Sequence, residues 1–127
     1  MIRYITLGAH DLTACGAFYD GLMPTLGCER LETPAYGFGY GPKGGKADLW
    51  VIKANNGLPP TYGNGTMVAL DAPSRKAVDA FHAAALADGG FDEGKPGIRG
   101  GDDSHFYSCY VRDLTGNKLS AVYNQPE

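Results

Sequence analysis

Residues 106–124, FYSCYVRDLTGNKLSAVYN, contain two apolar and aromatic runs on either side of the turn formers Leu114-Thr115-Gly116-Asn117. Short runs rich in Val, Tyr and Phe that are bounded by Gly and Asn are typical of neighbouring β-strands. The stretch therefore predicts strands at 104–113 and 118–124, joined by a turn.

The residues before this hairpin predict a strand, a helix and a further strand. Residues 67–71 alternate as a strand does, and Ser74 is a favourable N-cap for the helix that follows. Gly89-Gly90 should end that helix, and the glycine-broken segment 91–101 is the weakest of the predicted strands. The apolar residues expected to face inward from the helix are Ala77, Val78, Phe81 and Leu86.

The first half of the chain repeats this order. A strand at 2–8 precedes a helix capped by Asp11, and Pro24 should end or bend the helix. Strands are expected at 28–33, 36–41 and 47–53. The glycine-rich segment 35–46 favours a hairpin turn over a phosphate-binding loop, because no Gly-Lys-Ser/Thr ending follows. Residues 55–65 show no period and indicate a connection between two similar halves.

The two helices superpose when the chain is shifted by 63 residues, which also brings the cap Asp11 onto Ser74. Any two amphipathic helices entered from a strand can be aligned in this way, so chance remains an alternative. A true repeat would place two curled sheets around a groove lined by alternate strand residues. The identical pairs are Ala14 and Ala77, Ala17 and Ala80, Phe18 and Phe81, and Gly27 and Gly90.

Composition limits the classes of function. A chain of 127 residues with 43% apolar and 20% charged residues is expected to form one domain, and no run reaches the roughly 20 apolar residues of a membrane span. A net charge of −3 with 11 Lys and Arg argues against nucleic acid as a partner. No secretory leader is recognisable, so the expected location is cytoplasmic. The three cysteines are interpreted as small apolar fillers.

Three phrases resemble the vicinal oxygen chelate superfamily, the group of glyoxalases, bleomycin-resistance proteins and extradiol dioxygenases. They are ITLGAHDLTACGAFYDGLMPTLGCERL (5–31), VDAFHAAALADGGFDEGKPGIR (78–99) and the 106–124 hairpin. The resemblance implies an α+β fold in which two tandem βαβββ modules, 1–57 and 64–127, form an open curved mixed sheet around a central cleft. It also implies a single domain over 1–127, often in a homodimer.

In metal-using relatives, four inward positions supply His, Gln or Glu ligands to one divalent ion. The matching positions here are Tyr4, Trp50, Met67 and Ser120. A phenol, an indole, a thioether and a serine hydroxyl are poor ligands for such an ion. We therefore expect neither a metal nor another cofactor, and a partly aromatic cleft floor.

Other side chains are expected to complete a ligand-binding cleft, although catalytic residues cannot be identified. His105 is a candidate base at the cleft mouth or an ordinary strand-end histidine, and Arg112 is a candidate anion contact or a turn residue. About half of the aromatic residues could be core instead. The remaining predicted cleft residues are Tyr40, Tyr107 and Tyr110.

The favoured hypothesis is a metal-free protein that binds a small aromatic or amphipathic molecule without chemistry. The alternative is a metal-dependent lyase, similar to lactoylglutathione lyase, or an extradiol dioxygenase-type enzyme. Its ion would be held by displaced residues such as His105 with Asp48 or Asp71. A third possibility is a filled cleft in an interaction or dimerisation module.

Overall fold

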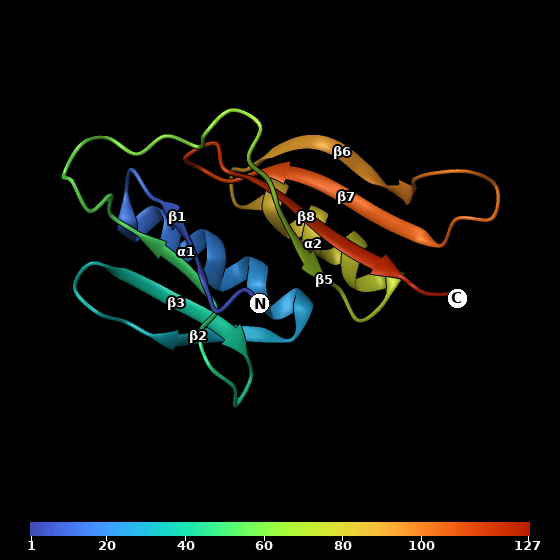
Figure 1. The fold of residues 1–127 in the computed structure, drawn as a ribbon, viewed down its shortest axis with the longest axis horizontal. Coiled ribbons are helices and arrows are strands. Elements are labelled where there is room, and N and C mark those ends of the chain that lie inside the picture. The colour runs from blue at the N-terminus through green and yellow to red at the C-terminus, as the bar shows by residue number, and fades with distance from the viewer.

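The computed structural model describes residues 1–127, which form two modules of the same topology (Figure 1). Module 1 contains β1 (Ile5–Gly8), α1 (Leu12–Leu22), the short 3₁₀ helix η1 (Met23–Leu26), β2 (Cys28–Glu32), β3 (Gly37–Pro42) and β4 (Leu49–Ile52). Its four strands form one mixed sheet in the order β1-β4-β3-β2, with β1 parallel to β4.

Module 2 contains β5 (Val68–Asp71), α2 (Arg75–Ala87), β6 (Phe91–Ile98), β7 (Phe106–Arg112) and β8 (Lys118–Asn124). Its sheet has the matching order β5-β8-β7-β6, with β5 parallel to β8. The α+β class and the two tandem modules are thereby confirmed, with one sheet in each module. The module limits 1–57 and 64–127 stay a prediction.

The internal repeat is confirmed by the positions of the elements. β5 starts and ends 63 residues after β1, and the first residue of α2 lies 63 residues after the first residue of α1. Asp11 Oδ1 accepts from the Ala14 amide at 3.0 Å, and Ser74 Oγ accepts from the Ala77 amide at the same distance. Pro24 stands in the first turn of η1, so α1 ends before it.

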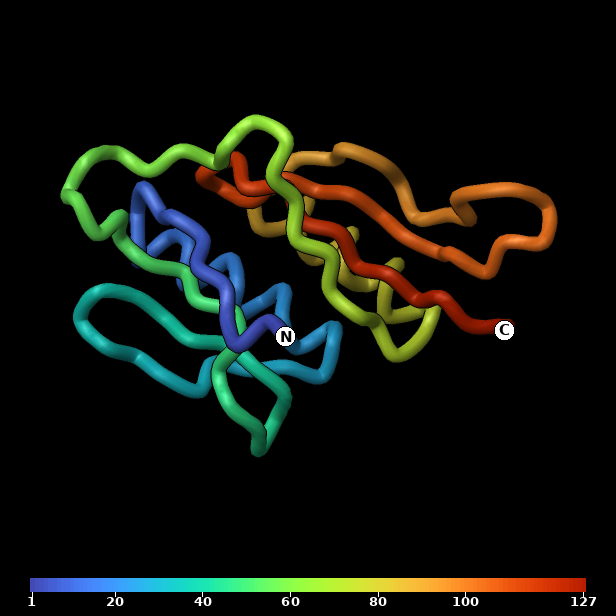
Figure 2. The backbone as a smooth tube through the Cα atoms, in the orientation of Figure 1, coloured from blue at the N-terminus to red at the C-terminus, as the bar shows by residue number.

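Several predicted boundaries need correction. β1 begins at Ile5, three residues later than predicted, because the parallel pairing with β4 starts at the Ile5–Leu49 pair. In α2 the inward position near the end is Ala85, whereas Leu86 is 41% exposed. Residues 55–65 contain no helix or strand and cross from one module to the other, as predicted (Figure 2).

The hydrophobic core lies between the helices and the sheets. Both helices lie behind the sheets in Figure 1, and the buried cluster draws on both modules. Phe18 of α1 and Phe81 of α2, a pair in the repeat, are both buried in it. We call the face of each sheet turned away from the helices its outer face. None of the helices is long and apolar enough to cross a membrane.

The cysteines have the predicted filler role where they are buried. Cys15 and Cys109 are buried and free, and Cys28 is partly exposed and free. Burial raises the pKa of each thiol above its ordinary value, so these side chains stay protonated at neutral pH.

A buried carboxylate joins the two modules. Asp113, in the turn between β7 and β8, is only 1% exposed. Its Oδ2 accepts from the Tyr19 hydroxyl of α1 at 2.6 Å and from Asn117 Nδ2 at 2.9 Å. Asn117 also donates to the Gly8 carbonyl of β1. Burial and the neighbouring Asp113 carboxylate raise the pKa of Tyr19 far above normal, so its hydroxyl remains a donor.

Candidate functional site

A groove of about 460 Å³ opens on the outer face of the module 1 sheet. Its floor is formed by Thr6 of β1 and by Trp50 and Ile52 of β4. Trp50 and Ile52 share this face because side chains alternate along a strand. The N-terminal segment and the connections that flank β3 supply the remaining lining residues, which are Arg3, Tyr4, Tyr36, Lys46 and Ala47.

Alternate glycines on β3 create the space for this groove. The outward positions of β3 are occupied by Gly37, Gly39 and Gly41, so this strand contributes no side chain to the outer face. A Cβ atom on Gly39 would lie 2.9 Å from the Trp50 ring and 2.8 Å from Ala47 Cβ. The indole therefore lies against the bare β3 backbone, in space that any larger residue would occupy.

Aromatic rings form one wall of the groove. Tyr36 and Trp50 are stacked, with ring centroids 6.4 Å apart and planes inclined by 27°. Tyr4 and Tyr36 are each 57% exposed, an unusually large exposure for aromatic side chains that gather at one place. The charged lining residues are both basic, Arg3 and Lys46, and the Lys46 ammonium donates to the Arg3 carbonyl at 3.1 Å.

The four positions that match metal ligands do not share one cavity. Tyr4 and Trp50 line the module 1 groove, whereas Met67 lines a separate crevice between the modules. Ser120 is fully buried, lines no groove, and its Oγ has no hydrogen-bond partner in the chain. This donor set does not fit a hard divalent ion, because an indole cannot coordinate and a thioether favours soft metals.

No other group of three or more His, Cys, Asp or Glu side chains lies close enough together to hold a metal. Asp48 and Asp71 line the same crevice between the modules, but His105 is exposed and lines no groove. Of the other histidines, His82 pairs with Asp92 at 2.9 Å on the surface. The displaced ligand set considered above is therefore not assembled in this chain.

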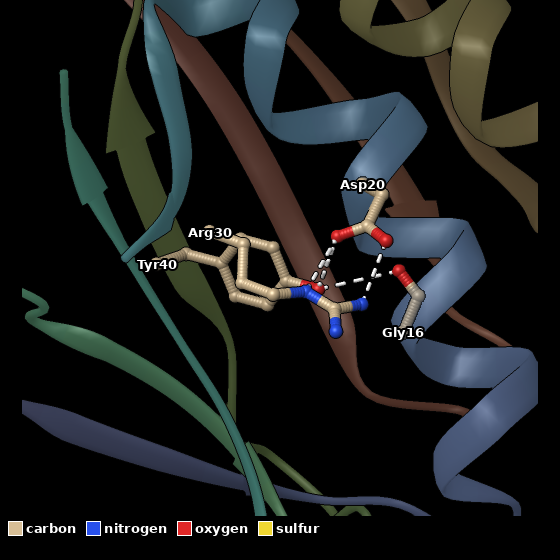
Figure 3. A network of polar contacts seen from close by, with 4 residues as sticks. All are labelled: Gly16, Asp20, Arg30 and Tyr40. Carbon is tan, nitrogen blue, oxygen red and sulfur yellow. Dashed lines mark hydrogen bonds and ion pairs between the residues drawn. The ribbon is translucent and has the colours of Figure 1, made fainter. Parts of the chain in front are cut away.

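Two of the predicted cleft residues lie on the opposite face of their sheets. Tyr40 is completely buried against α1, with its hydroxyl 3.2 Å from the Gly16 carbonyl and 3.0 Å from Asp20 Oδ1 (Figure 3). Arg30 also binds Asp20, through Nη2 at 2.6 Å. Tyr107 donates to Asp79 of α2 at 2.6 Å. Neither tyrosine lines a groove, which corrects their predicted placement.

Around Tyr110 the outer face of module 2 is occupied by side chains of that module. Tyr110 is flanked by Arg99 and Lys118, each with its charged group 5.4 Å from the ring centroid. Arg112 is engaged by Glu93 at 2.9 Å and by the Gly116 carbonyl at 2.9 Å. Neither Tyr110 nor Arg112 lines any groove. The arginine has the turn and ion-pair contacts that were the alternative to anion binding.

The groove residues that sequence reasoning did not assign to the cleft are Arg3, Thr6, Tyr36, Lys46, Ala47 and Ile52. The period-two glycines at 37, 39 and 41 were the available signal. On a strand this spacing leaves one face without side chains, and that face can receive a ring from its neighbour.

Comparisons with known proteins place the chain among solved structures of one kind. No protein-family model and no curated protein matches it. A glyoxalase/bleomycin resistance protein from Albidiferax ferrireducens T118 is 35% identical, with a TM-score of 0.86 over 97% of this chain and 98% of that one.

Two further solved structures share the fold at lower identity. One is a glyoxalase/bleomycin resistance protein/dioxygenase family enzyme from Burkholderia phytofirmans PsJN, 18% identical with a TM-score of 0.74 over 98% of both chains. The other is a glyoxalase-related enzyme from Fulvimarina pelagi, 20% identical with a TM-score of 0.75 over 98% of this chain and 88% of that one.

Proposed function

We propose that this chain, which belongs to the glyoxalase/bleomycin resistance protein family of the vicinal oxygen chelate superfamily, binds a small aromatic or amphipathic molecule in the module 1 groove. The observation that carries the proposal is an open groove of about 460 Å³ with a stacked pair of aromatic rings in its wall. Small-molecule sites have volumes of about 300–1,000 Å³ and largely apolar, aromatic linings.

Exposure of the rings supports this role. Tyr4 and Tyr36 leave more than half of their surface to solvent, although each could be buried by a planar guest. Offset stacking on Trp50 or Tyr36 would contribute about 0.5–1.5 kcal/mol per ring pair beyond the buried area. The proposed binding residues are therefore Tyr4, Tyr36 and Trp50.

Binding of this kind requires no metal and no chemical step. The groove is lined by two basic residues and by no carboxylate, imidazole or thiol that could act as a divalent-metal ligand. The protein would sequester its ligand, as the resemblance to bleomycin-resistance proteins implies. The homodimer expected from the family stays a prediction.

Calorimetric titration with a neutral bicyclic alcohol, 2-naphthalenemethanol, tests the proposal. Trp50 is the sole tryptophan, so a shift of its indole N–H resonance in an NMR spectrum locates the bound probe. Tyr36→Ala should weaken binding about three- to tenfold, since it removes one stacking partner. Tyr62→Ala, at a tyrosine outside the groove, is the matched control and should leave affinity unchanged.

Two results would contradict the proposal. In the first, the indole resonance stays in place up to the solubility limit of the probe. In the second, Tyr36→Ala and Tyr62→Ala have equal effects. The rival, a metal-dependent lyase or dioxygenase-type enzyme with displaced ligands, would instead be supported by about one equivalent of tightly held divalent metal per chain.

A further inference from the structure

We infer that the module 1 groove selects aromatic molecules that carry an anionic group, such as arene carboxylates or sulfonates. The inference rests on the proposed function, because it names the class of ligand for the same groove. It goes beyond that function by predicting the sign of the charge and the end of the groove at which the charge binds.

The charge of the groove is opposite to that of the whole chain. The net charge is −3, yet the groove is lined by Arg3 and Lys46 and by no acidic residue. Asp48, the nearest acidic residue in sequence, lines the crevice between the modules together with Arg3 and Asp71, and it forms no ion pair with either cation. A cationic ligand would meet repulsion here, and an anionic one would meet two charges of opposite sign.

The Arg3 side chain forms no hydrogen bond, ion pair or cation–π contact, unlike those of the other four arginines of the chain. Arg30, Arg75 and Arg112 each bind a carboxylate, and Arg99 donates to the Lys95 carbonyl. All four also lie over an aromatic ring. The Arg3 guanidinium has no partner of either kind, so its planar set of donors is free for a carboxylate or sulfonate.

The two basic residues and Tyr36 lie at different ends of the groove, and Tyr4 adjoins Arg3 at the basic end. In the parallel register of β1 and β4, Thr6 pairs with Trp50 and Gly8 with Ile52, so Arg3 and Lys46 lie beyond the start of both strands. Tyr36 precedes Gly37, which pairs with Ile52 at the other end. A bicyclic arene with one anionic substituent fits this arrangement.

Three probes with the same ring system separate charge from stacking. They are 2-naphthoate, 2-naphthalenemethanol and 2-naphthylmethylammonium, each titrated calorimetrically with the Trp50 indole resonance as the locating signal. The anion should bind about tenfold more tightly than the alcohol, and the ammonium compound most weakly. The preference for the anion should shrink as NaCl is raised, because the cations are exposed.

Charge-removing variants test the two cations directly. Arg3→Gln and Lys46→Gln should each weaken 2-naphthoate binding about two- to fivefold, a larger loss than either variant causes for the uncharged alcohol. Both side chains are exposed, so the fold should be maintained. Lys53→Gln, at a lysine outside this groove, is the matched control and should change neither affinity.

The outcomes distinguish the two proposals. If the alcohol binds at Trp50 as tightly as the anion, or the ammonium compound binds most tightly, anion selection is overturned while the proposed function stands. If no probe moves the indole resonance, the proposed function itself fails. Equal losses in Lys46→Gln and Lys53→Gln would reduce the anion preference to an effect of net charge and would also overturn the inference.

Discussion

The two modules share one topology but place their large aromatic residue on different strands. Across the outer face of module 1, the paired residues are Thr6, Trp50 and Gly39. The corresponding row of module 2 is Ala69, Ser120 and Tyr110. The large ring therefore stands on β4 in the first module and on β7 in the second, with a small residue opposite it in each case.

This exchange of large and small residues explains why only module 1 has a groove there. The Trp50 ring lies against the glycine face of β3, so its exposed side remains available to a guest. Tyr110 is instead enclosed by Arg99 and Lys118, and no groove opens beside it. A duplicated fold can thus divide its tasks, with a groove beside the large aromatic residue of one module and none beside that of the other.

The connections between the last two strands of each module differ as well. In module 2 this turn carries Asp113, which reaches Tyr19 of module 1. In module 1 the corresponding connection carries Asp48, whose exposed carboxylate forms no hydrogen bond or ion pair in the chain. The second module therefore supplies the buried carboxylate that holds the two modules together, which we call the Asp113 clamp, while the first supplies the groove.

Replacing Asp113 should have the largest effect on stability. Asp113→Ala leaves the Tyr19 hydroxyl, the Asn117 amide groups and the Thr115 amide without their acceptor. Leaving buried donors unpaired costs about 1–3 kcal/mol each, so we expect a loss of about 3 kcal/mol or more in the free energy of unfolding. Urea denaturation measures it, provided that the m-value is unchanged.

Asp48→Ala is the matched control for this clamp. Its carboxylate is exposed and unpaired, so its removal should change the free energy of unfolding by no more than about 0.5 kcal/mol. Similar losses in the two variants would mean that the β7–β8 turn does not hold the modules together, and the proposed division of tasks would fail.

Filling the space above β3 should have a moderate effect. In Gly39→Ala the new methyl group would overlap the Trp50 ring and Ala47 Cβ. Overpacking costs about 1–3 kcal/mol, which outweighs the roughly 0.5–1 kcal/mol that alanine gains over glycine in a strand. We expect a net loss of about 1–2 kcal/mol by urea denaturation and weaker binding of 2-naphthalenemethanol.

Gly101→Ala serves as the control, because a Cβ atom there would meet nothing within 4 Å. Its stability should stay the same or rise slightly, and its affinity for the probe should not change. If Gly39→Ala behaves in the same way, the Trp50 ring moves freely and the glycines are not what shapes the groove.

Local signals in the sequence predicted the framework correctly. The N-caps Asp11 and Ser74, the end of α1 before Pro24 and the strand 118–124 all depend on a few neighbouring residues. The 63-residue repeat was visible for the same reason, since each copy repeats its own caps and periods. The resemblance to the family then gave the pairing of these elements into modules.

The face to which each side chain near β3 points could not be predicted from the sequence. Simple alternation groups Tyr36 with Phe38 and Tyr40, but Tyr36 lies in the turn before β3 and points to the groove. Phe38 and Tyr40 face α1, where Arg30 lies over the Phe38 ring at 3.9 Å. The partner of the Tyr40 hydroxyl, Asp20, is 20 residues away and carries no local signal.

The smallest effect among the three test variants, and the only clear gain in stability among them, is expected at Ser120, the small member of the module 2 pair. Ser120 Oγ is buried and unpartnered, so Ser120→Ala should raise the free energy of unfolding by about 1 kcal/mol, because a desolvated hydroxyl is removed. Ser108→Ala is the control: this equally buried serine donates to the Tyr110 hydroxyl at 3.4 Å, so its loss should lower stability by about 0.5 kcal/mol. A loss in Ser120→Ala would show that a bound water or a ligand satisfies the hydroxyl. The outer face of module 2 would then hold a polar site beside Tyr110, and the contrast between the Trp50 and Tyr110 rows would no longer stand.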